Sequence, residues 1–258
     1  MKVISYSLFN YHAFTDTNRF EFMAMLRGAY WNFRMNRMIY PGWTTAIHTD
    51  TETYQSFQKY FEQLQSLGAS VMCVSSNPAI SVGMLWRLLP LWEVGVTHVL
   101  CRDSDALTTY REAQAVTEWL STTGYPIHAI LDNPMHAGLM GGMIGLTSAL
   151  VQDNPSFEQV ISNEALTDRG RDQDILNKKF SHYPILWHRG SADVYSALAD
   201  VEPPGVKASL WESNLTCRHI GSAGVVEMET IRFFNRFDPS DQFTAFEKQF
   251  PNVFYWHG

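Results

Sequence analysis

The sequence has few cysteines, few charged residues and no excess of basic ones. Three cysteines without C-x-x-C spacing do not make a disulfide framework, so we expect reduced, buried thiols in a cytoplasmic protein. Charged residues make up 17% of the chain, and 26 acidic against 19 basic residues give a net charge of −7. A surface of that sign repels phosphate backbones and anionic lipids, which disfavours binding to nucleic acid or to a membrane surface.

Long hydrophobic runs are also scarce. The longest apolar stretch, residues 137–151, contains four glycines and two hydroxyl residues and falls short of a membrane span. Residues 1–8 have the pattern of a β-strand rather than of a leader peptide. The chain has 258 residues, of which 45% are hydrophobic and 14% aromatic. This composition excludes a disordered protein, and the length predicts one globular domain.

Strand-like and helix-like segments alternate through the first half of the chain. We expect strands at residues 2–8, 44–49, 70–74, 97–101 and 126–131. Helices are expected from residue 16 or 17 onward, from 51 to a left-handed stop at Gly68, at 84–91 and at 111–120. This alternation predicts an α/β fold with a mostly parallel sheet covered on both faces, which binds ligands beyond the carboxyl ends of its strands. The second half is less regular.

Two carboxylates, Asp103 and Asp105, directly follow the apolar strand expected at 97–101. If the chain stays extended, both project on the same side, and their oxygens can converge on Mg²⁺ or Mn²⁺. The alternative is a solvated turn whose aspartates cap the next helix. Because the pair follows a buried strand, we favour the metal site.

Two further segments carry candidate ligands. Asp172 and Asp174 flank Gln173 in a second D-x-D, where Asp172 either caps a short helix or, with Gln173, binds sugar hydroxyls. His219 is followed by Ile220 and Gly221, and it is either a structural histidine or a metal ligand that the flexible backbone brings close.

Taken together and in this order, these motifs resemble the metal-dependent nucleotide-sugar glycosyltransferases of GT-A fold. Residues 103–105 match the D-x-D of that family, and residues 172–177 resemble the DQD-I-L-N segment of its retaining galactosyl- and glucosyltransferase branch. Residues 219–221 resemble the later H-x-G of that branch. Shorter segments resemble uncharacterised bacterial and viral glycosyltransferases, at residues 5–9, 40–43, 84–87, 102–105 with 111–112, and 141–143.

The resemblance implies a donor half, residues 1–131, and an acceptor- and metal-completing half, residues 132–258. It implies Mn²⁺ or Mg²⁺ held by Asp103, Asp105 and His219. The implied catalytic residues are Asp132, Asp172, Gln173 and Asp174. The residues implied in donor binding are Phe9, Asn10, Tyr11, Arg87, Arg102, Ser104 and Gly221.

The sequence departs from that branch at two places. Ser222 follows the H-x-G segment where the branch has a lysine that neutralises the diphosphate, so we expect Arg87, Arg102 or Arg218 to take that role. The Asn-x-Gly segment of the branch is absent, and residues 141–143 stand in its place.

Two of the implied positions have plain structural alternatives. Asp132 precedes Asn133-Pro134, where an Asx-turn explains it equally well. Phe9 follows the first strand, and an aromatic residue that closes the core is nearly as good an interpretation as one that cradles a nucleobase.

These features predict transfer of a sugar, most simply from a uridine diphosphate sugar, to a hydroxyl group of a glycan, a lipid-linked acceptor or a small molecule. The transition state resembles an oxocarbenium ion, which carboxylates stabilise. One alternative is a haloacid-dehalogenase-type phosphatase, although that family has Thr or Val where this chain has Leu107 and places its D-x-D on the first strand. The other alternative is a catalytically silent GT-A module that binds a glycan or a partner.

Overall fold

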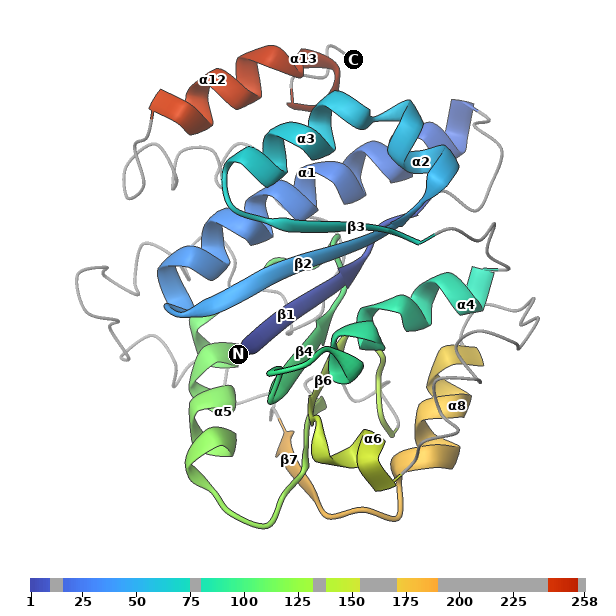
Figure 1. The fold of residues 1–258 in the computed structure, drawn as a ribbon, viewed down its shortest axis with the longest axis vertical. Helices are drawn as coiled ribbons and strands as arrows, with labels where there is room; N and C mark the ends of the chain where they lie inside the picture. The colour runs from blue at the N-terminus through green and yellow to red at the C-terminus, as the bar shows by residue number, and fades with distance from the viewer. Residues whose placement is uncertain (10–15, 75–79, 132–137, 154–170, 190–240, 255–258) are drawn as a thin grey trace.

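The computed structural model describes residues 1–9, 16–74, 80–131, 138–153, 171–189 and 241–254. Its centre is one seven-stranded sheet with helices on both sides (Figure 1). The strands are β1 (Lys2–Ser7), β2 (Trp43–Asp50), β3 (Ser70–Val74), β4 (His98–Arg102), β5 (Ile127–Leu131), β6 (Met143–Thr147) and β7 (Ile185–Arg189). The helices are α1 (Asp16–Ile39), α2 (Thr51–Ser56), α3 (Gln58–Ser66), α4 (Ile80–Leu85), the 3₁₀-helix η1 (Trp86–Trp92), α5 (Tyr110–Ser121), α6 (Ala149–Asp153), α8 (Arg171–Phe180), α12 (Asp241–Gln249) and α13 (Pro251–Phe254).

The sheet has the strand order β3-β2-β1-β4-β6-β5-β7. All pairs are parallel except those of β6, which runs antiparallel to both β4 and β5. The predicted fold class, an α/β domain with a mostly parallel mixed sheet flanked by helices, is therefore confirmed. The order reverses direction between β1 and β4, where ligands of such sheets commonly bind.

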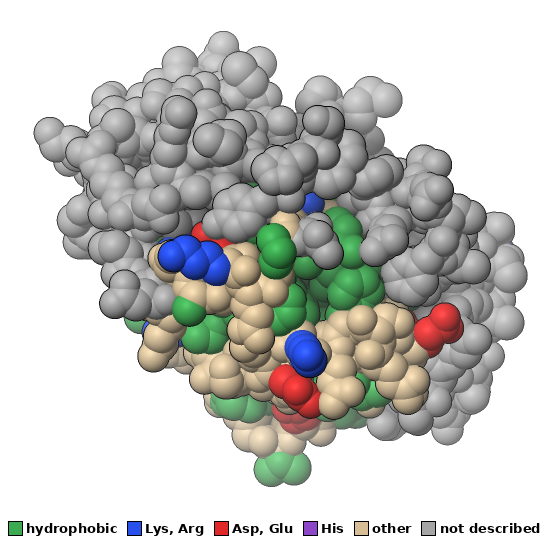
Figure 2. Space-filling view, turned by 90° about the horizontal axis from the view of Figure 1, so that it is seen from above, with side chains coloured by type: hydrophobic (Ala, Val, Ile, Leu, Met, Phe, Trp, Pro, Cys, Tyr) green, Lys and Arg blue, Asp and Glu red, His purple; other side chains and the backbone are tan. Residues whose placement is uncertain are grey.

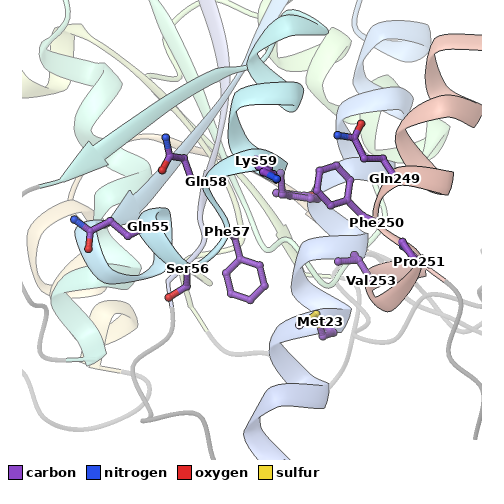
Figure 3. A pocket seen from close by; sticks show the side chains of 11 residues that line it. Met23, Gln55, Ser56, Phe57, Gln58, Lys59, Gln249, Phe250, Pro251 and Val253 are labelled. Carbon is purple, nitrogen blue, oxygen red and sulfur yellow. The ribbon is translucent and has the colours of Figure 1, made fainter.

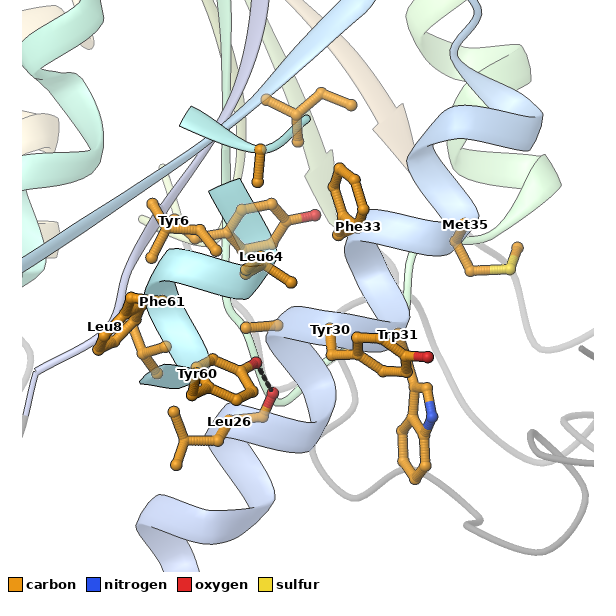
Figure 4. Close-up of a cluster of buried hydrophobic side chains, with 14 of the residues drawn as sticks. Tyr6, Leu8, Leu26, Tyr30, Trp31, Phe33, Met35, Tyr60, Phe61 and Leu64 are labelled. Carbon is orange, nitrogen blue, oxygen red and sulfur yellow. Dashed lines mark hydrogen bonds between the residues drawn. The ribbon is translucent and has the colours of Figure 1, made fainter. Parts of the chain in front are cut away.

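Alternating side chains of the strands divide most of the described core into two large apolar clusters, beside a small third one at Ala115, Ile130 and Met143. Ile4 and Leu100 belong to the cluster beneath α1, α3, α12 and α13, whereas Val3 and Val99 belong to the cluster beneath η1, α6 and α8. Figure 4 shows part of the first cluster, in which the Tyr60 hydroxyl donates a hydrogen bond of 2.6 Å to the Leu26 carbonyl on α1. The two clusters cover both faces of the sheet, as expected for parallel strands.

Several details differ from the sequence expectation. The helix expected from residue 51 is two helices, and its N-cap is Asp50, whose carboxylate accepts from the Thr53 amide at 2.8 Å. Gly68 does end this region with a left-handed φ of 106°. The expectation of buried thiols holds for Cys101 but is wrong for Cys73, which is exposed on the edge strand β3, while Cys217 lies outside the described residues.

No helix within the described ranges combines the length and the apolarity that a membrane crossing needs.

Candidate functional site

The end of β4 distributes consecutive side chains to opposite faces of the sheet. Cys101 packs in the η1–α8 cluster, and Arg102 points to the other face, where it meets α5. Asp103 then returns to the η1–α8 face. This alternation of period two decides which of the predicted residues meet.

One arginine joins the two predicted D-x-D motifs. Arg87, on η1, donates from Nη1 to Asp103 Oδ1 at 2.5 Å and from Nη2 to Asp172 Oδ2 at 3.1 Å. Its Nε donates to the Met84 carbonyl at 2.8 Å, which fixes the plane of the guanidinium. Burial alone lowers the pKa of Arg87, but the carboxylates of Asp103 and Asp172 more than reverse this, so its pKa is raised and it stays charged.

The three members of this cluster differ in exposure. The side chain of Arg87 is 7% exposed and that of Asp172 is 4% exposed, whereas Asp103 is 46% exposed. A buried cation is thus paired with one buried carboxylate and one half-exposed carboxylate just beyond the carboxyl end of β4. We call Arg87, Asp103 and Asp172 the acid–arginine cluster.

Two glycines lie directly against this cluster. A Cβ atom on Gly142 would overlap the Asp103 carboxylate, and one on Gly141 would come within 2.5 Å of Asp172 Oδ2 and 2.9 Å of Arg87 Nη2. Gly142 precedes Met143, which pairs with Arg102 in the β4–β6 ladder. The backbone of this turn therefore approaches the acids as closely as glycine alone allows.

Asp172 reaches the cluster because it stands in the first turn of α8, where the helix dipole favours a carboxylate. Asn177 fixes α8 to the glycine-rich segment, since its side chain accepts from the Leu139 amide at 2.9 Å and donates to the Leu139 carbonyl at 3.1 Å. Sequence reasoning quoted Asn177 only as part of a motif. Gln173, whose carbonyl accepts from Asn177, is partly buried, and Asp174 is 70% exposed beside Arg171, so neither joins the cluster.

Arg102 lies on the other face, away from the acid–arginine cluster. It is 4% exposed, and its Nε donates to Glu112 Oε1 at 2.6 Å while Nη1 donates to the carbonyls of Cys101 and Ile144. Burial acts to lower the pKa of Arg102, but Glu112, Tyr40 and Tyr6 together raise this pKa by more, so the group stays charged. This placement favours an internal structural role over contact with a diphosphate, and sequence reasoning had missed Glu112 as its partner.

The stretch after β4 is a turn rather than an extended segment. The strand ends at Arg102, and Ser104 and Asp105 form the turn, with Ser104 buried and Asp105 partly buried. The period-two reason for placing Asp103 and Asp105 on one side is therefore wrong. Their oxygens still lie within one turn of the chain and are the hard donors that Mg²⁺ and Mn²⁺ prefer, so the residues present fit such an ion.

A complete metal site is not formed by the described residues alone. Within the described ranges, no three His, Cys, Asp or Glu residues are grouped closely enough to hold an ion. Arg218, His219 and Gly221 lie outside those ranges, as do Asn10, Tyr11 and Asp132, so their predicted roles stay predictions.

Phe9 and Cys101 are internal. The Phe9 ring is 6% exposed, lies 5.4 Å from the Trp86 ring and fills the space beside Gly83. This placement favours the core-closing interpretation of Phe9 over contact with a nucleobase. Burial raises the pKa of the Cys101 thiol to about 12, so it remains protonated and is a poor nucleophile.

A separate hollow of about 490 Å³ lies in the opposite helical layer, between α1, the α2–α3 junction and the C-terminal helices. Figure 3 shows Phe57, Phe250 and Val253 around it, with Gln58 and Lys59 nearby. Figure 2 shows one face of the molecule, and on the part of it that is coloured by type, apolar side chains lie between separate charged groups. The hollow contains none of the residues that sequence reasoning had singled out for chemistry.

No known protein-family model matches this sequence, and no curated protein sequence is detectably similar to it.

Solved structures share its architecture at low identity. Mannosyltransferase PcManGT from Pyrobaculum calidifontis, in complex with GDP-Man and Mn²⁺, is 11% identical, with 98% of this chain and 80% of that chain covered and a TM-score of 0.49. TarS 1–349 from S. aureus is 11% identical, with the same coverages and a TM-score of 0.46. A 4-diphosphocytidyl-2C-methyl-D-erythritol synthase from Anaerococcus prevotii is 8% identical, with coverages of 74% and 87% and a TM-score of 0.46. Likenesses of this size do not decide an activity, so function has to be inferred from the side chains.

Proposed function

We propose that this protein is a glycosyltransferase that moves a sugar from a nucleoside diphosphate donor, uridine diphosphate in the first instance, to a hydroxyl acceptor. The observation that carries the proposal is the acid–arginine cluster. Asp103 and Asp172, which are 69 positions apart in sequence (172 − 103), meet on one guanidinium at the carboxyl edge of the sheet. This edge is where α/β sheets bind nucleotides and their derivatives.

The cluster has the chemistry that a sugar ring needs. Carboxylate oxygens accept hydrogen bonds from vicinal hydroxyls, and Asp172 is held in one orientation by Arg87 and by its place in α8. When the glycosidic bond breaks, positive charge develops on the ring, and a buried, preorganised carboxylate stabilises that charge. In this proposal Asp172 acts through its negative charge rather than as a base, because its carboxylate already accepts from Arg87.

The diphosphate is proposed to bind on the open side of Asp103. That carboxylate is 46% exposed, so it can ligate an ion while its other oxygen stays on Arg87. Asp103, Asp105 and His219 would hold Mn²⁺ or Mg²⁺, which when bound supplies Lewis-acid stabilisation to the departing diphosphate. Residues 1–131 would form the nucleotide-binding half and residues 132–258 the half that completes the metal site and meets the acceptor.

In the reaction, the acceptor oxygen forms a bond to the anomeric carbon, and the bond from that carbon to the diphosphate oxygen breaks. The electron pair leaves with the nucleoside diphosphate, and a diphosphate oxygen takes the proton of the acceptor hydroxyl. The configuration is retained because the acceptor attacks on the same face from which the diphosphate leaves. An inverting route requires a carboxylate base on the opposite side, for which Asp174 is the more open candidate. The stereochemistry of the product separates the two routes.

Turnover tests the proposal. The purified protein is incubated with Mn²⁺ and a panel of sugar nucleotides, and release of free nucleoside diphosphate is measured. We expect release from at least one uridine diphosphate sugar, with loss on chelation of the metal. Phosphate release from a phosphomonoester would instead indicate the phosphatase, and the absence of both reactions and of any sugar-nucleotide binding would overturn the proposed function.

A pair of acid-to-amide variants tests the site itself. Asp172→Asn keeps the shape of the side chain but removes its charge beside Arg87, and we expect at least a tenfold loss of turnover. Glu62→Gln, on the exposed surface of α3 in the other helical layer, makes the same chemical change and should leave turnover as it is in the wild type. Equal turnover in the two variants would exclude Asp172 from the mechanism.

A further inference from the structure

Helix α1 carries a row of polar or small residues inside the core. Gly28, Asn32 and Asn36 follow one another at intervals of four on α1 and share one face of the helix, and Tyr40 continues the same spacing one residue beyond the helix end at Ile39. All four are buried, with Asn32 at 0% and Asn36 at 2% exposure. We call these four residues the α1 polar row. Amides are placed in an interior only where partners satisfy them, so the partners indicate what the row does.

Asn32 bonds to the loop that carries the first D-x-D. Its Nδ2 donates to the carbonyls of Ser104 at 3.1 Å and Ala106 at 2.9 Å, and its Oδ1 accepts from the Thr108 amide at 2.8 Å and from Thr108 Oγ1 at 3.0 Å. Two donors and two lone pairs are the full capacity of an amide side chain. A single side chain therefore holds three positions of the 104–108 loop.

Gly28 brings the helix against the same loop. A Cβ atom at Gly28 would overlap the Ser104 carbonyl oxygen and would lie 3.3 Å from the Asp105 Cα. The helix backbone thus lies directly beneath the turn that contains Ser104 and Asp105. The N-terminal half of the α1 polar row, Gly28 and Asn32, serves this loop.

The C-terminal half of the row bonds to other elements. Asn36 Nδ2 donates to the Tyr6 hydroxyl at 3.0 Å and to Thr45 Oγ1 at 3.1 Å, which lie on β1 and β2. Tyr40 donates to Glu112 on α5 at 3.2 Å. Asn36 reaches the loop only through Tyr6, whose hydroxyl is 3.4 Å from Thr108 Oγ1. The row therefore offers a matched pair of buried amides, one that holds the loop and one that holds the sheet.

We propose that Asn32, with Gly28, is a positioning residue that fixes where Asp103 and Asp105 present their oxygens to the donor. This inference rests on the proposed function. The turn after β4 contains the two partly exposed acids, and the bonds of the buried Asn32 amide to Ser104, Ala106 and Thr108 fix its path. Removing Asn32 leaves two loop carbonyls and one amide without their bonds, and the acids then lose their fixed position. A displacement of about 1 Å in a catalytic group lowers a rate by about 100-fold.

The test compares Asn32→Ala with Asn36→Ala in the full-length protein. Hydrogen exchange of residues 103–109 reports on the loop, and titrations with Mn²⁺ and uridine diphosphate report on the site. Both variants should unfold at a lower temperature than the wild type. Asn32→Ala should also lose loop protection and bind Mn²⁺ and uridine diphosphate at least tenfold more weakly, whereas Asn36→Ala should keep both properties near wild type.

A second pair approaches the contact from the loop. Thr108→Ser keeps the hydroxyl that donates to Asn32, and Thr108→Val removes it with little change in shape. We expect the serine variant to keep loop protection and binding and the valine variant to lose part of both, which decides the matter even if Asn32→Ala does not fold.

The outcomes separate the two proposals. Equal loop exchange and equal binding in Asn32→Ala and Asn36→Ala, or in the two Thr108 variants, would overturn the positioning role. A wild-type protein that binds no sugar nucleotide would overturn the proposed function and with it the catalytic meaning of the loop. The exchange data would then still show whether Asn32 fixes the loop.

Discussion

At the scale of single residues, two arginines that look alike in the sequence have different surroundings. Arg87 lies 16 positions before Asp103 and Arg102 lies directly before it, and each was a candidate for contact with the diphosphate. The alternation of β4 sends Arg102 to Glu112 on α5, and η1 brings Arg87 to Asp103 and Asp172. Sequence spacing cannot tell them apart, because the face that each one meets depends on strand alternation and on elements distant in sequence.

Arg87→Lys tests whether the fork of the guanidinium matters. A lysine keeps the charge, but its single ammonium cannot bond to both carboxylates and to the Met84 carbonyl with fixed geometry. We expect sugar-nucleotide turnover to fall by about 100-fold while the circular dichroism spectrum is retained. Turnover within twofold of the wild type would show that charge alone is enough at this position.

Buried histidines make the stability depend on pH. Burial lowers the pKa of His48 from 6.5 to about 4, and it also lowers that of His128 well below 6.5. Between pH 6.5 and pH 4 these histidines are therefore protonated in the unfolded chain but neutral in the folded protein. The free energy of unfolding falls as the pH falls through that window. For His48 alone the loss is about 3 kcal/mol by pH 4.

Urea denaturation between pH 7 and pH 4 measures this dependence. His48→Gln should flatten the curve, and His182→Gln, at an exposed histidine after α8, should leave the slope as it is. The same slope in all three proteins would contradict the assignment to His48.

At the scale of elements, the turn before β6 brings the backbone against the acids. Gly142→Ala places a methyl group where the Asp103 carboxylate lies, so Asp103 or the turn must move. We expect turnover to fall by about 100-fold, because the acid leaves its position on Arg87. Met143→Leu, a substitution of similar volume at the neighbouring buried residue, should change turnover little. An unaffected Gly142→Ala enzyme would show that this close approach is unimportant.

How far the sequence predicts the elements depends on where their regularity comes from. β1 to β5 are β-rich runs between helical patterns and were expected. β6 and β7 were not expected. The run of residues 143–147 lies in a glycine-rich stretch, and β6 owes its strand character to pairing with β4 and β5 on both sides, while β7 pairs with β5. Gly145 is required in β6 because the Trp119 ring lies where a side chain would be.

The candidate site was also predictable only in part, because some of its residues follow from local sequence and others from contacts between distant elements. Acids after a strand can be read from local sequence, and Asp103 and Asp172 were both singled out. Asn32 was not, because a polar residue in an amphipathic helix is by default assigned to the solvent face. Its burial follows from the 104–108 loop, which lies over it only in the folded chain.

At the scale of the whole molecule, the last helices are tied to the first. Glu247 on α12 accepts from Arg34 Nη1 on α1 at 3.0 Å and from the Tyr30 hydroxyl at 3.0 Å, and both ends of the ion pair are buried. This contact joins residues 213 positions apart and closes the helical layer that also contains the α1 polar row.

Glu247→Gln should therefore destabilise the entire fold. Removing one partner of a buried ion pair costs about 3–5 kcal/mol, because the remaining charge stays in the interior. Chemical denaturation measures the loss, and Lys248→Ala, at the exposed neighbour, should cost less than about 1 kcal/mol. A similar small effect in both variants would mean that the C-terminal helices add little to stability.

The most direct test of the donor site is the position of bound manganese in a crystal soaked with Mn²⁺ and uridine diphosphate, located by its anomalous scattering. The account predicts one strong peak coordinated by Asp103 or Asp105 and by a diphosphate oxygen, with Arg87 still bonded to Asp172. Manganese and nucleotide bound away from the carboxyl end of β4, with Asp103 and Asp105 in contact with neither, would contradict it.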